Sequence, residues 1–419
     1  MGNHTAGAVD LFLTKNKRLV FSAIYFLTWA AFAAFLMDFI FFSQKVGMTN
    51  SQIGLMNAAI GLVGIAIQPL AGFICDFLRT TRKVIMVLMV FGILFSLIMP
   101  FAGESGSLPV VMAVVFGYTI FMCSYLSLLD NWVARECIGE TTFHFGALRL
   151  WGSLSYAMVA LAYGRLSMTA YLSYAYYFRA FFLLLALICI FLYKHETISD
   201  KSPKDSAGDK GKPMVRELFK SPEYMLLFLF AFLMGLALTS TGNFFTPLML
   251  HRGGTNSLIG VAGSINAIIE IPFFIYSHKL TGRIGPRGLM LTGIVFNCIQ
   301  IVGFAFFGSP AGLIVAYFMA APYVSLYGTG FLYYVYSIAP PKTEVLAQTA
   351  IQAIAGGLAG MLGNLLGGIV IDRFGIDVMY RSALIIAVIS LAIFLGTSLW
   401  LKMKRNDLTI DESANSYSE

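Results

Sequence analysis

The sequence places four ionisable residues inside long apolar stretches: Asp38, Asp130, Arg149 and Glu270. An ionised side chain in the middle of an apolar helix costs free energy when that helix lies in a membrane. Such groups pair with one another or face a water-filled cavity, and they mark paths for solutes, ions or protons. These four residues are therefore the first candidates for a functional site.

Asp130 and Arg149 lie on either side of a polar turn centred near Gly139 and Glu140. Each is about nine to ten residues from that turn, which corresponds to a depth of roughly 14 Å in a helix. We expect the two residues to sit near the middle of a membrane as a pair that faces an aqueous cavity and binds substrate. The alternative is a structural ion pair between neighbouring helices.

Glu270 stands near the middle of another apolar stretch, just before Pro272. A carboxylate there can take up and release a proton as its surroundings become dry or wet, which makes Glu270 the first candidate for proton coupling and Asp130 the second. Hydrogen bonding to a neighbouring helix is the alternative role of Glu270. Asp38 lies toward the outer end of the first apolar stretch, and it is a third coupling candidate, a gate residue, a substrate contact or an acid at the membrane rim.

The composition predicts a membrane protein. Of 419 residues, 58% are hydrophobic and only 12% are charged, whereas soluble domains carry about 25% charged residues. The mean hydropathy is +0.78. The net charge of +7 comes from short basic clusters between apolar stretches, so we expect it to face anionic lipid and not nucleic acid.

No cofactor or metal site is expected. The five cysteines lie in or next to apolar stretches, which argues against a disulfide framework, and no Cys/His cluster has metal-ligand spacing. The sequence contains no nucleophile with a neighbouring base and no phosphate-binding loop, so it does not indicate an enzyme. The protein is therefore predicted to have no catalytic residues.

Twelve stretches are long and apolar enough to cross a membrane as helices. They lie at 19–42, 52–75, 84–101, 108–133, 144–164, 172–193, 224–250, 256–278, 287–307, 311–336, 345–370 and 379–401. The polar segment 194–223 separates two sets of six, so we expect an N-terminal bundle (1–193), a linker that includes a short surface helix at Val215 to Phe219, a C-terminal bundle (224–402) and a tail (403–419).

The distribution of Lys and Arg predicts that both termini are cytoplasmic. With this orientation most basic residues fall on the cytoplasmic side, as the positive-inside rule requires. The basic residues assigned to the outer side are Lys45, Arg165, Arg179, Arg252, Arg373 and Arg381.

Polar and aromatic side chains in the predicted helices are further candidates for binding a solute with hydroxyl groups and flat rings. They are Trp132, Trp151, Asn243, Tyr323 and Tyr327. For any single tyrosine, packing between helices is an equally simple role.

The segment from Gly72 through Asp76 to Arg82 and Lys83 resembles the signature between the second and third helices of major facilitator transporters. Phe77 replaces a basic residue of that pattern, and the loop glycine is absent. Gly72 is expected to allow close helix approach, and Asp76 to pair at a neighbouring helix end. The resemblance implies that Gly72, Asp76, Arg82 and Lys83 form a conformational gate.

The segment from Leu129 to Tyr156 resembles the same region of the lactose permease and its relatives, the nucleoside and phenylpropionate proton symporters. The resemblance implies that Asp130 and Arg149 bind the solute and that Tyr156 stacks on it. Gln300 approximately matches a helix 9 arginine of the permease, and Asn297 lies one turn away. The titratable pair of the permease on helix 10 has no counterpart here, so coupling must differ and galactoside specificity should not be transferred.

These observations together predict an all-α integral membrane protein with twelve transmembrane helices in two six-helix bundles, the major facilitator fold. We expect a monomer in a bacterial-type cytoplasmic membrane. Its predicted function is proton-coupled symport of a small polar solute, such as a saccharide or nucleoside, by alternating access. The main alternative is a proton-coupled exporter of drugs or metabolites.

Overall fold

A computed structural model describes residues 16–34, 38, 41–137, 145–166, 173–193, 220–339 and 344–416. Within these ranges every regular element is a helix. We call the described residues up to Tyr193 the N-terminal half and those from Lys220 the C-terminal half. The surface helix predicted at Val215 to Phe219 and most of the predicted linker lie outside the described residues.

The N-terminal half contains eight helical elements in the described ranges. They are α2 (Lys17–Phe32), the π-helix η1 (Phe41–Lys45), α4 (Asn50–Leu78), α5 (Thr81–Glu104), α6 (Leu108–Met122), α7 (Tyr125–Glu136), α8 (Phe145–Leu166) and α9 (Tyr174–Leu192). The predicted span at 108–133 is interrupted between α6 and α7, at Cys123 and Ser124.

The C-terminal half begins with a helix and ends with one that runs to the edge of the described chain. Its elements are α12 (Pro222–Asn243), α13 (Phe245–His251), α14 (Asn256–Phe306), α15 (Pro310–Tyr317), α16 (Ala320–Ile338), α17 (Glu344–Gln352), η3 (Ala353–Leu358), α18 (Ala359–Phe374) and α19 (Ile376–Ser416). The last helix extends well past residue 401, where the sequence predicted its end.

Local sequence signals set several of these boundaries. Thr80, Ser221 and Thr255 each accept a hydrogen bond from a backbone N–H in the first turn of the helix that follows. The long α14 bends at Gly285, whose φ of 73° is left-handed, and Pro286 follows it. The bend divides α14 into two stretches that correspond to the predicted spans at 256–278 and 287–307.

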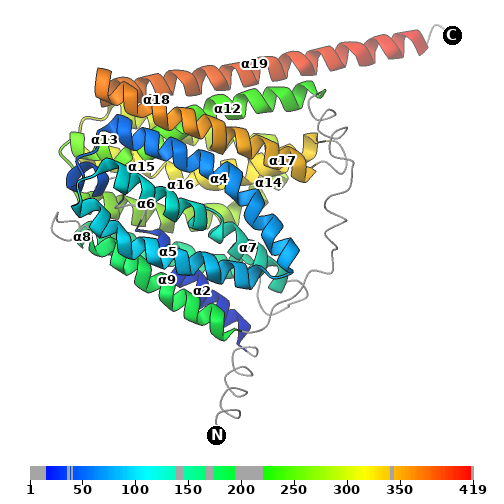
Figure 1. Ribbon diagram of the computed structural model, residues 1–419. Coiled ribbons are helices and arrows are strands. Elements are labelled where there is room, and N and C mark those ends of the chain that lie inside the picture. Colours follow the sequence, from blue (N-terminus) through cyan, green and yellow to red (C-terminus); the bar gives the residue numbers. More distant parts are fainter. Residues whose placement is uncertain are drawn as a thin grey trace.

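Ten stretches of the described chain are long and apolar enough to cross a membrane. The other two predicted spans correspond to α2 and α8. Figure 1 shows the two halves beside each other, with α4 of the N-terminal half along α18 of the C-terminal half. The second extensive contact between the halves is made by α8 and α14.

The apolar core is shared at one end of the molecule and divided at the other. One buried cluster combines residues of both halves, including Phe41, Met56, Phe245 and Tyr380. A second cluster, around Trp132, contains residues of the N-terminal half alone. A third, which includes Tyr224, Phe230 and Phe394, contains residues of the C-terminal half alone.

We call the end with the shared cluster the closed side and the opposite end the split side. On the closed side lie the start of α4 and the end of α18, where Asp372 accepts hydrogen bonds from the Asn50 side chain (2.9 Å) and the Ser51 backbone N–H (2.7 Å). The buried cluster of the split side contains residues of α2 and residues near the end of α9. The start of α2 and the end of α19 lie toward this side in Figure 1.

Glycines allow the two halves to approach closely on the closed side. A Cβ atom added to Gly54 of α4 would meet the backbone oxygen of Asn364 in α18, and one added to Gly368 would meet the backbone oxygen of Asn50. Gly72, farther along α4, was expected to lie at a close helix contact. A Cβ atom there would meet nothing within 4 Å, so this expectation is wrong for the conformation seen here.

Candidate functional site

A cavity of about 450 Å³ lies between the two halves. Its polar lining includes Asn57, Tyr118 and Tyr156 from the N-terminal half and Asn243, Tyr317 and Asn364 from the C-terminal half. Apolar residues such as Met56 and Phe245 complete the wall on the closed side. Because both halves contribute to one cavity, a molecule bound there would contact both of them.

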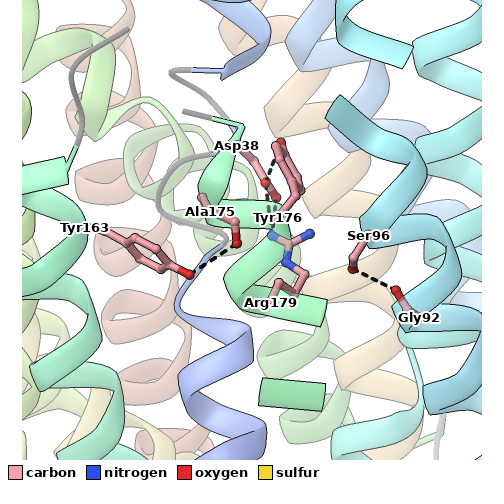
Figure 2. A network of polar contacts seen from close by, with 7 residues as sticks. All are labelled: Asp38, Gly92, Ser96, Tyr163, Ala175, Tyr176 and Arg179. Carbon is pink, nitrogen blue, oxygen red and sulfur yellow. Dashed lines mark hydrogen bonds and ion pairs between the residues drawn. The ribbon is translucent and has the colours of Figure 1, made fainter. Parts of the chain in front are cut away.

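An ion pair lies in the wall of this cavity. Nη2 of Arg179, in α9, is 3.0 Å and 3.3 Å from the two carboxylate oxygens of Asp38. Tyr176 donates a further hydrogen bond to Asp38, at 3.0 Å, and Figure 2 shows all three side chains converging. Both charged residues line the cavity.

Arg179 was predicted to lie on the outer side of the membrane, and in the structure it is buried inside the N-terminal half. Its side chain is only 4% exposed, and its guanidinium lies near the rings of Tyr118 and Tyr176. Asp38, which is 23% exposed, likewise belongs to the cavity and not to a membrane rim. The pair is buried because α9 turns this face toward the interior of the N-terminal half.

The opposite wall carries an amide pair. Asn243, at the end of α12, donates a hydrogen bond from its side chain to the side-chain oxygen of Asn364 in α18, at 2.7 Å. Both residues line the cavity. The predicted binding residue Asn243 therefore faces the same cavity as Tyr156, which comes from the other half.

A second charged group, which we call the interhalf cluster, consists of Asp130, Arg149 and Glu270. Asp130 in α7 accepts a hydrogen bond from the Tyr25 hydroxyl at 2.7 Å. The Arg149 guanidinium in α8 lies 3.8 Å from the ring centroid of Trp29. Asp130 and Arg149 interact electrostatically, but each has a different nearest partner, so they are not the simple pair that was expected.

Glu270 connects the interhalf cluster to the cavity. It lies in α14 of the C-terminal half and interacts electrostatically with Arg149 of the N-terminal half. Its charge also acts on Tyr156 and Tyr317, both of which line the cavity. The three charged residues predicted from the sequence are thus brought together, and they join the two halves electrostatically.

Other predicted binding residues lie elsewhere. Trp132 is fully buried in the N-terminal half, with its ring centroid 5.4 Å from that of Phe21. Trp151 is 44% exposed. Neither is among the residues that line the cavity.

Four predicted residues of the C-terminal half form contacts within that half. Asn297 and Gln300 are buried, and the Asn297 side chain donates to the Gln300 side chain at 3.4 Å. The rings of Tyr323 and Tyr327 stack with centroids 5.4 Å apart. These contacts are those of helix packing, which was the alternative role considered for the tyrosines.

The predicted gate residues make contacts inside the N-terminal half. Arg82 donates hydrogen bonds at 3.0 Å to the backbone oxygens of Ile190 and Phe191, at the end of α9. Lys83 borders an apolar groove between α5 and α9. The side chain of Asp76 lies outside the described residues, so the gate remains a prediction.

The sequence reasoning missed several polar residues of the cavity, among them Asn57, Arg179 and Asn364. Arg179 could have been found, because it falls inside the predicted span 172–193 and obeys the rule that singled out Glu270. Asn57 and Asn364 carry no charge, and asparagine in an apolar helix does not by itself indicate which side faces a cavity. Among the described residues no group of three or more His, Cys, Asp or Glu residues could hold a metal ion.

A family model described as the MFS_1 like family matches residues 19–382. The chain belongs to this family of major facilitator transporters. The predicted fold class, and the prediction of a transporter and not an enzyme, are thereby confirmed. The count of twelve helices and the cytoplasmic position of the termini remain predictions.

Two permeases are similar to this chain, one over nearly its whole length and one over part of it. The maltose permease of Geobacillus stearothermophilus is 27% identical over 390 residues, covering 93% of this chain and 96% of the permease. The xanthosine permease of Escherichia coli is 24% identical over 276 residues, covering 59% of this chain and 63% of that protein.

Solved structures show the same fold. The nucleoside transporter NupG aligns with a TM-score of 0.76 at 17% identity, covering 92% of this chain and 99% of NupG. The D-xylose-proton symporter aligns with a TM-score of 0.65 at 15% identity, covering 90% and 96% of the two chains. The family model and the similarity to the maltose permease identify the protein as a multi-pass membrane transporter of a small molecule.

Proposed function

We propose that this transporter is a proton-coupled symporter of a small polar solute, a saccharide or a nucleoside, and that it works by alternating access. The observation that carries the proposal is the interhalf cluster. Glu270 of one half interacts with Arg149 of the other, and the same carboxylate acts on two tyrosines of the cavity wall. A proton on Glu270 would therefore affect both the contact between the halves and the bound solute.

The cavity supports the substrate class. A volume of about 450 Å³ lies in the usual range for small-molecule sites. Amides and phenols line it from both halves, and such groups bind hydroxyls and flat rings. The names of the maltose and xanthosine permeases point to the same two classes of solute.

The proposed roles follow from position. Tyr156, Tyr317, Asn243 and Asn364 contact the solute in the cavity from the two halves. Arg149 and Asp130 bind the end of the solute that points to the split side, where they are held by Trp29 and Tyr25. Tyr156 provides a ring on which a sugar or base can stack.

The division of the core supports alternating access. If both chain ends are cytoplasmic, as the basic residues predict, the split side faces the cytoplasm and this conformation is open inward. Rocking the halves about the cavity would then separate the contacts on the closed side and bring the two cores of the split side together. The maltose and xanthosine permeases come from bacteria, which supports a location in the cytoplasmic membrane.

Proton coupling is assigned to Glu270. A negative Glu270 attracts Arg149 across the two halves, and a protonated Glu270 does not. Binding a proton therefore weakens one interaction between the halves on the side where they must move. Asp130 has Tyr25 as a second partner, and Asp38 has Arg179, so their charges are more strongly held.

Uptake into proteoliposomes tests the proposal. With labelled maltose and uridine as probes, the wild-type protein should accumulate at least one of them when the outside is acidic. Glu270→Gln should abolish accumulation but keep exchange of labelled for unlabelled solute, because exchange needs no net proton movement. Glu104→Gln, at an exposed acid that ends α5, is the matched control and should behave as wild type.

Two outcomes would contradict the proposal. Uptake that is indifferent to a pH gradient and to a protonophore would eliminate proton coupling. Absence of exchange for both solutes, together with extrusion of a lipophilic dye, would instead establish the exporter alternative.

A further inference from the structure

The ion pair of Asp38 and Arg179 differs from the other arginine pair of the described chain. Arg252 pairs with Asp377 in the C-terminal half, and neither residue lines the cavity. Asp38 and Arg179 both line the cavity, and the Arg179 side chain is only 4% exposed. A charged pair at the wall of a binding cavity is in a position to contact whatever occupies that cavity.

The pair retains hydrogen-bonding capacity. Both hydrogen bonds from Arg179 to Asp38 come from a single nitrogen, Nη2. The buried Nε has no hydrogen-bond partner. Asp38 accepts from Arg179 and Tyr176, its side chain is 23% exposed, and it is one of the residues that line the cavity. A carboxylate has about four acceptor positions, so it can accept further donors.

A purely structural role does not account for this arrangement. A buried ion pair is weak support for stability, because apolar residues of similar size often serve as well. Tyr176, which also binds Asp38, is buried away from the cavity and could hold the first span to α9 by itself. Arg179 is an additional charged residue in the lining of the cavity.

The charges of the cavity wall cancel. Asp38 and Arg179 are the acid and the base among its lining residues, and the other polar groups there are neutral amides, hydroxyls and phenols. An anion would have to share one guanidinium with Asp38, and two carboxylates on one guanidinium repel each other. A neutral diol meets no such conflict, since its oxygens accept from Arg179 while its hydroxyls donate to Asp38.

We infer that Asp38 and Arg179 form the anchor for adjacent hydroxyl groups of the solute and select a neutral polyhydroxy solute over an anion. This inference rests on the proposed function and adds to it a second recognition site in the wall of the cavity itself, whose lining does not include Arg149.

The test measures binding to purified full-length protein in nanodiscs by calorimetry. The probes are maltose and uridine, each with an anionic counterpart, maltobionate and uridine 5′-monophosphate. Wild type should bind a neutral probe and reject its counterpart. The double variant Asp38→Asn with Arg179→Gln keeps the cavity neutral and should weaken binding of the neutral probe by about ten- to a hundredfold, because hydrogen bonds to charged groups are lost.

The single variants should change charge selectivity in opposite directions. Asp38→Asn leaves Arg179 without its counter-charge, so affinity for the anionic counterpart should rise while affinity for the neutral probe falls. Arg179→Gln should not gain anion binding. If the ion pair had only a structural role, the two single variants would not differ in anion binding. The selectivity for anions therefore distinguishes a binding role from a structural one, even where a variant changes the stability.

One control completes the design. Arg252→Gln removes an arginine pair outside the cavity. It should bind the neutral probe with an affinity close to that of wild type. If the double variant binds as wild type does, or Asp38→Asn gains no anion binding, the inference is overturned while the proposed function stands. If wild type binds neither neutral probe, the proposed function itself fails.

Discussion

The closed side and the split side of this transporter hold the two halves together by different means. On the closed side the halves share one apolar core, and α4 and α18 approach at glycines. On the split side each half has its own core, and Arg149 and Glu270, whose charges interact, lie on α8 and α14, which pack together across the halves. Close packing is short-ranged and fails once a gap opens, whereas charges still interact across it.

The two charged groups differ in the same way. Asp38 and Arg179 belong to one half and are in direct contact, so a rocking of the halves leaves their geometry unchanged. Arg149 and Glu270 belong to different halves, so the same motion must change their separation. This difference is why we place solute recognition at the first pair and coupling at the second.

The largest expected effect comes from blocking the glycine contact of the closed side. Gly54→Leu would force a side chain against the backbone of Asn364, which cannot rotate away. Overpacking of this kind typically costs about 1–3 kcal/mol, so the closed side should open and exchange transport should fall to background. Spin labels replacing the exposed Glu104 and His251, in a protein without its five native cysteines, should report a longer distance between the halves.

Gly72→Leu is the control in the same helix. Its added side chain would have no neighbouring atom within 4 Å of Cβ in this conformation, so the label distance should remain that of wild type. Equal effects of the two substitutions would mean that the damage is to α4 itself and not to the contact between the halves.

The second effect concerns the split side. Arg149→Gln removes the charge that joins Glu270 to Asp130 while leaving both cores intact. Loss of hydrogen bonds from a charged group should lower the rate of solute exchange about ten- to a hundredfold. Arg149→Lys keeps the charge but cannot stack its planar group on Trp29, and it should retain part of the activity.

Exchange rates in proteoliposomes would check this prediction, and unfolding temperatures would show whether stability contributes. If Arg149→Lys and Arg149→Gln were equally impaired, geometry on Trp29 would matter more than charge. If Arg149→Gln exchanged solute at the wild-type rate, the functional role of the interhalf cluster would be contradicted.

The sequence predicted the fold class well for a simple physical reason. A membrane requires about twenty apolar residues for each helix, and this demand is visible in hydropathy alone. The breaks within predicted spans were not visible in the sequence. The residues of α6 and α7 form one apolar stretch, as do those of α12 and α13, because a break inside a helix leaves the hydropathy unchanged. The kink at Gly285 and Pro286 is the exception, since both residues signal a break.

The site was predicted in part, again for physical reasons. The cost of a buried charge identified Asp130, Arg149 and Glu270, and the structure brings them together. Whether the other predicted binding residues reach the cavity depends on how each helix is rotated about its axis. Trp132 faces a core and Tyr156 faces the cavity, although both are aromatic residues in apolar stretches. That choice depends on the neighbouring helices, which the local sequence does not specify.

The smallest expected effect concerns the polar contact of the closed side. The Asp372 carboxylate, from the C-terminal half, accepts two hydrogen bonds at the first residues of α4 and also places a negative charge at that helix N-terminus. Asp372→Asn removes the charge and one acceptor. A capping interaction is worth about 1 kcal/mol. The population of molecules in which the two halves have separated at the closed side should therefore rise about fivefold.

The spin-label distances used for Gly54→Leu would measure this shift. Asp377→Asn is the matched control, because Asp377 pairs with Arg252 within the C-terminal half and does not bridge the halves. It should change the unfolding temperature without changing the label distances. Equal shifts for Asp372→Asn and Asp377→Asn would show that stability of the C-terminal half sets the population. A shift for Asp372→Asn alone would show that a carboxylate from one half, bound to a helix end of the other, helps to keep the closed side shut.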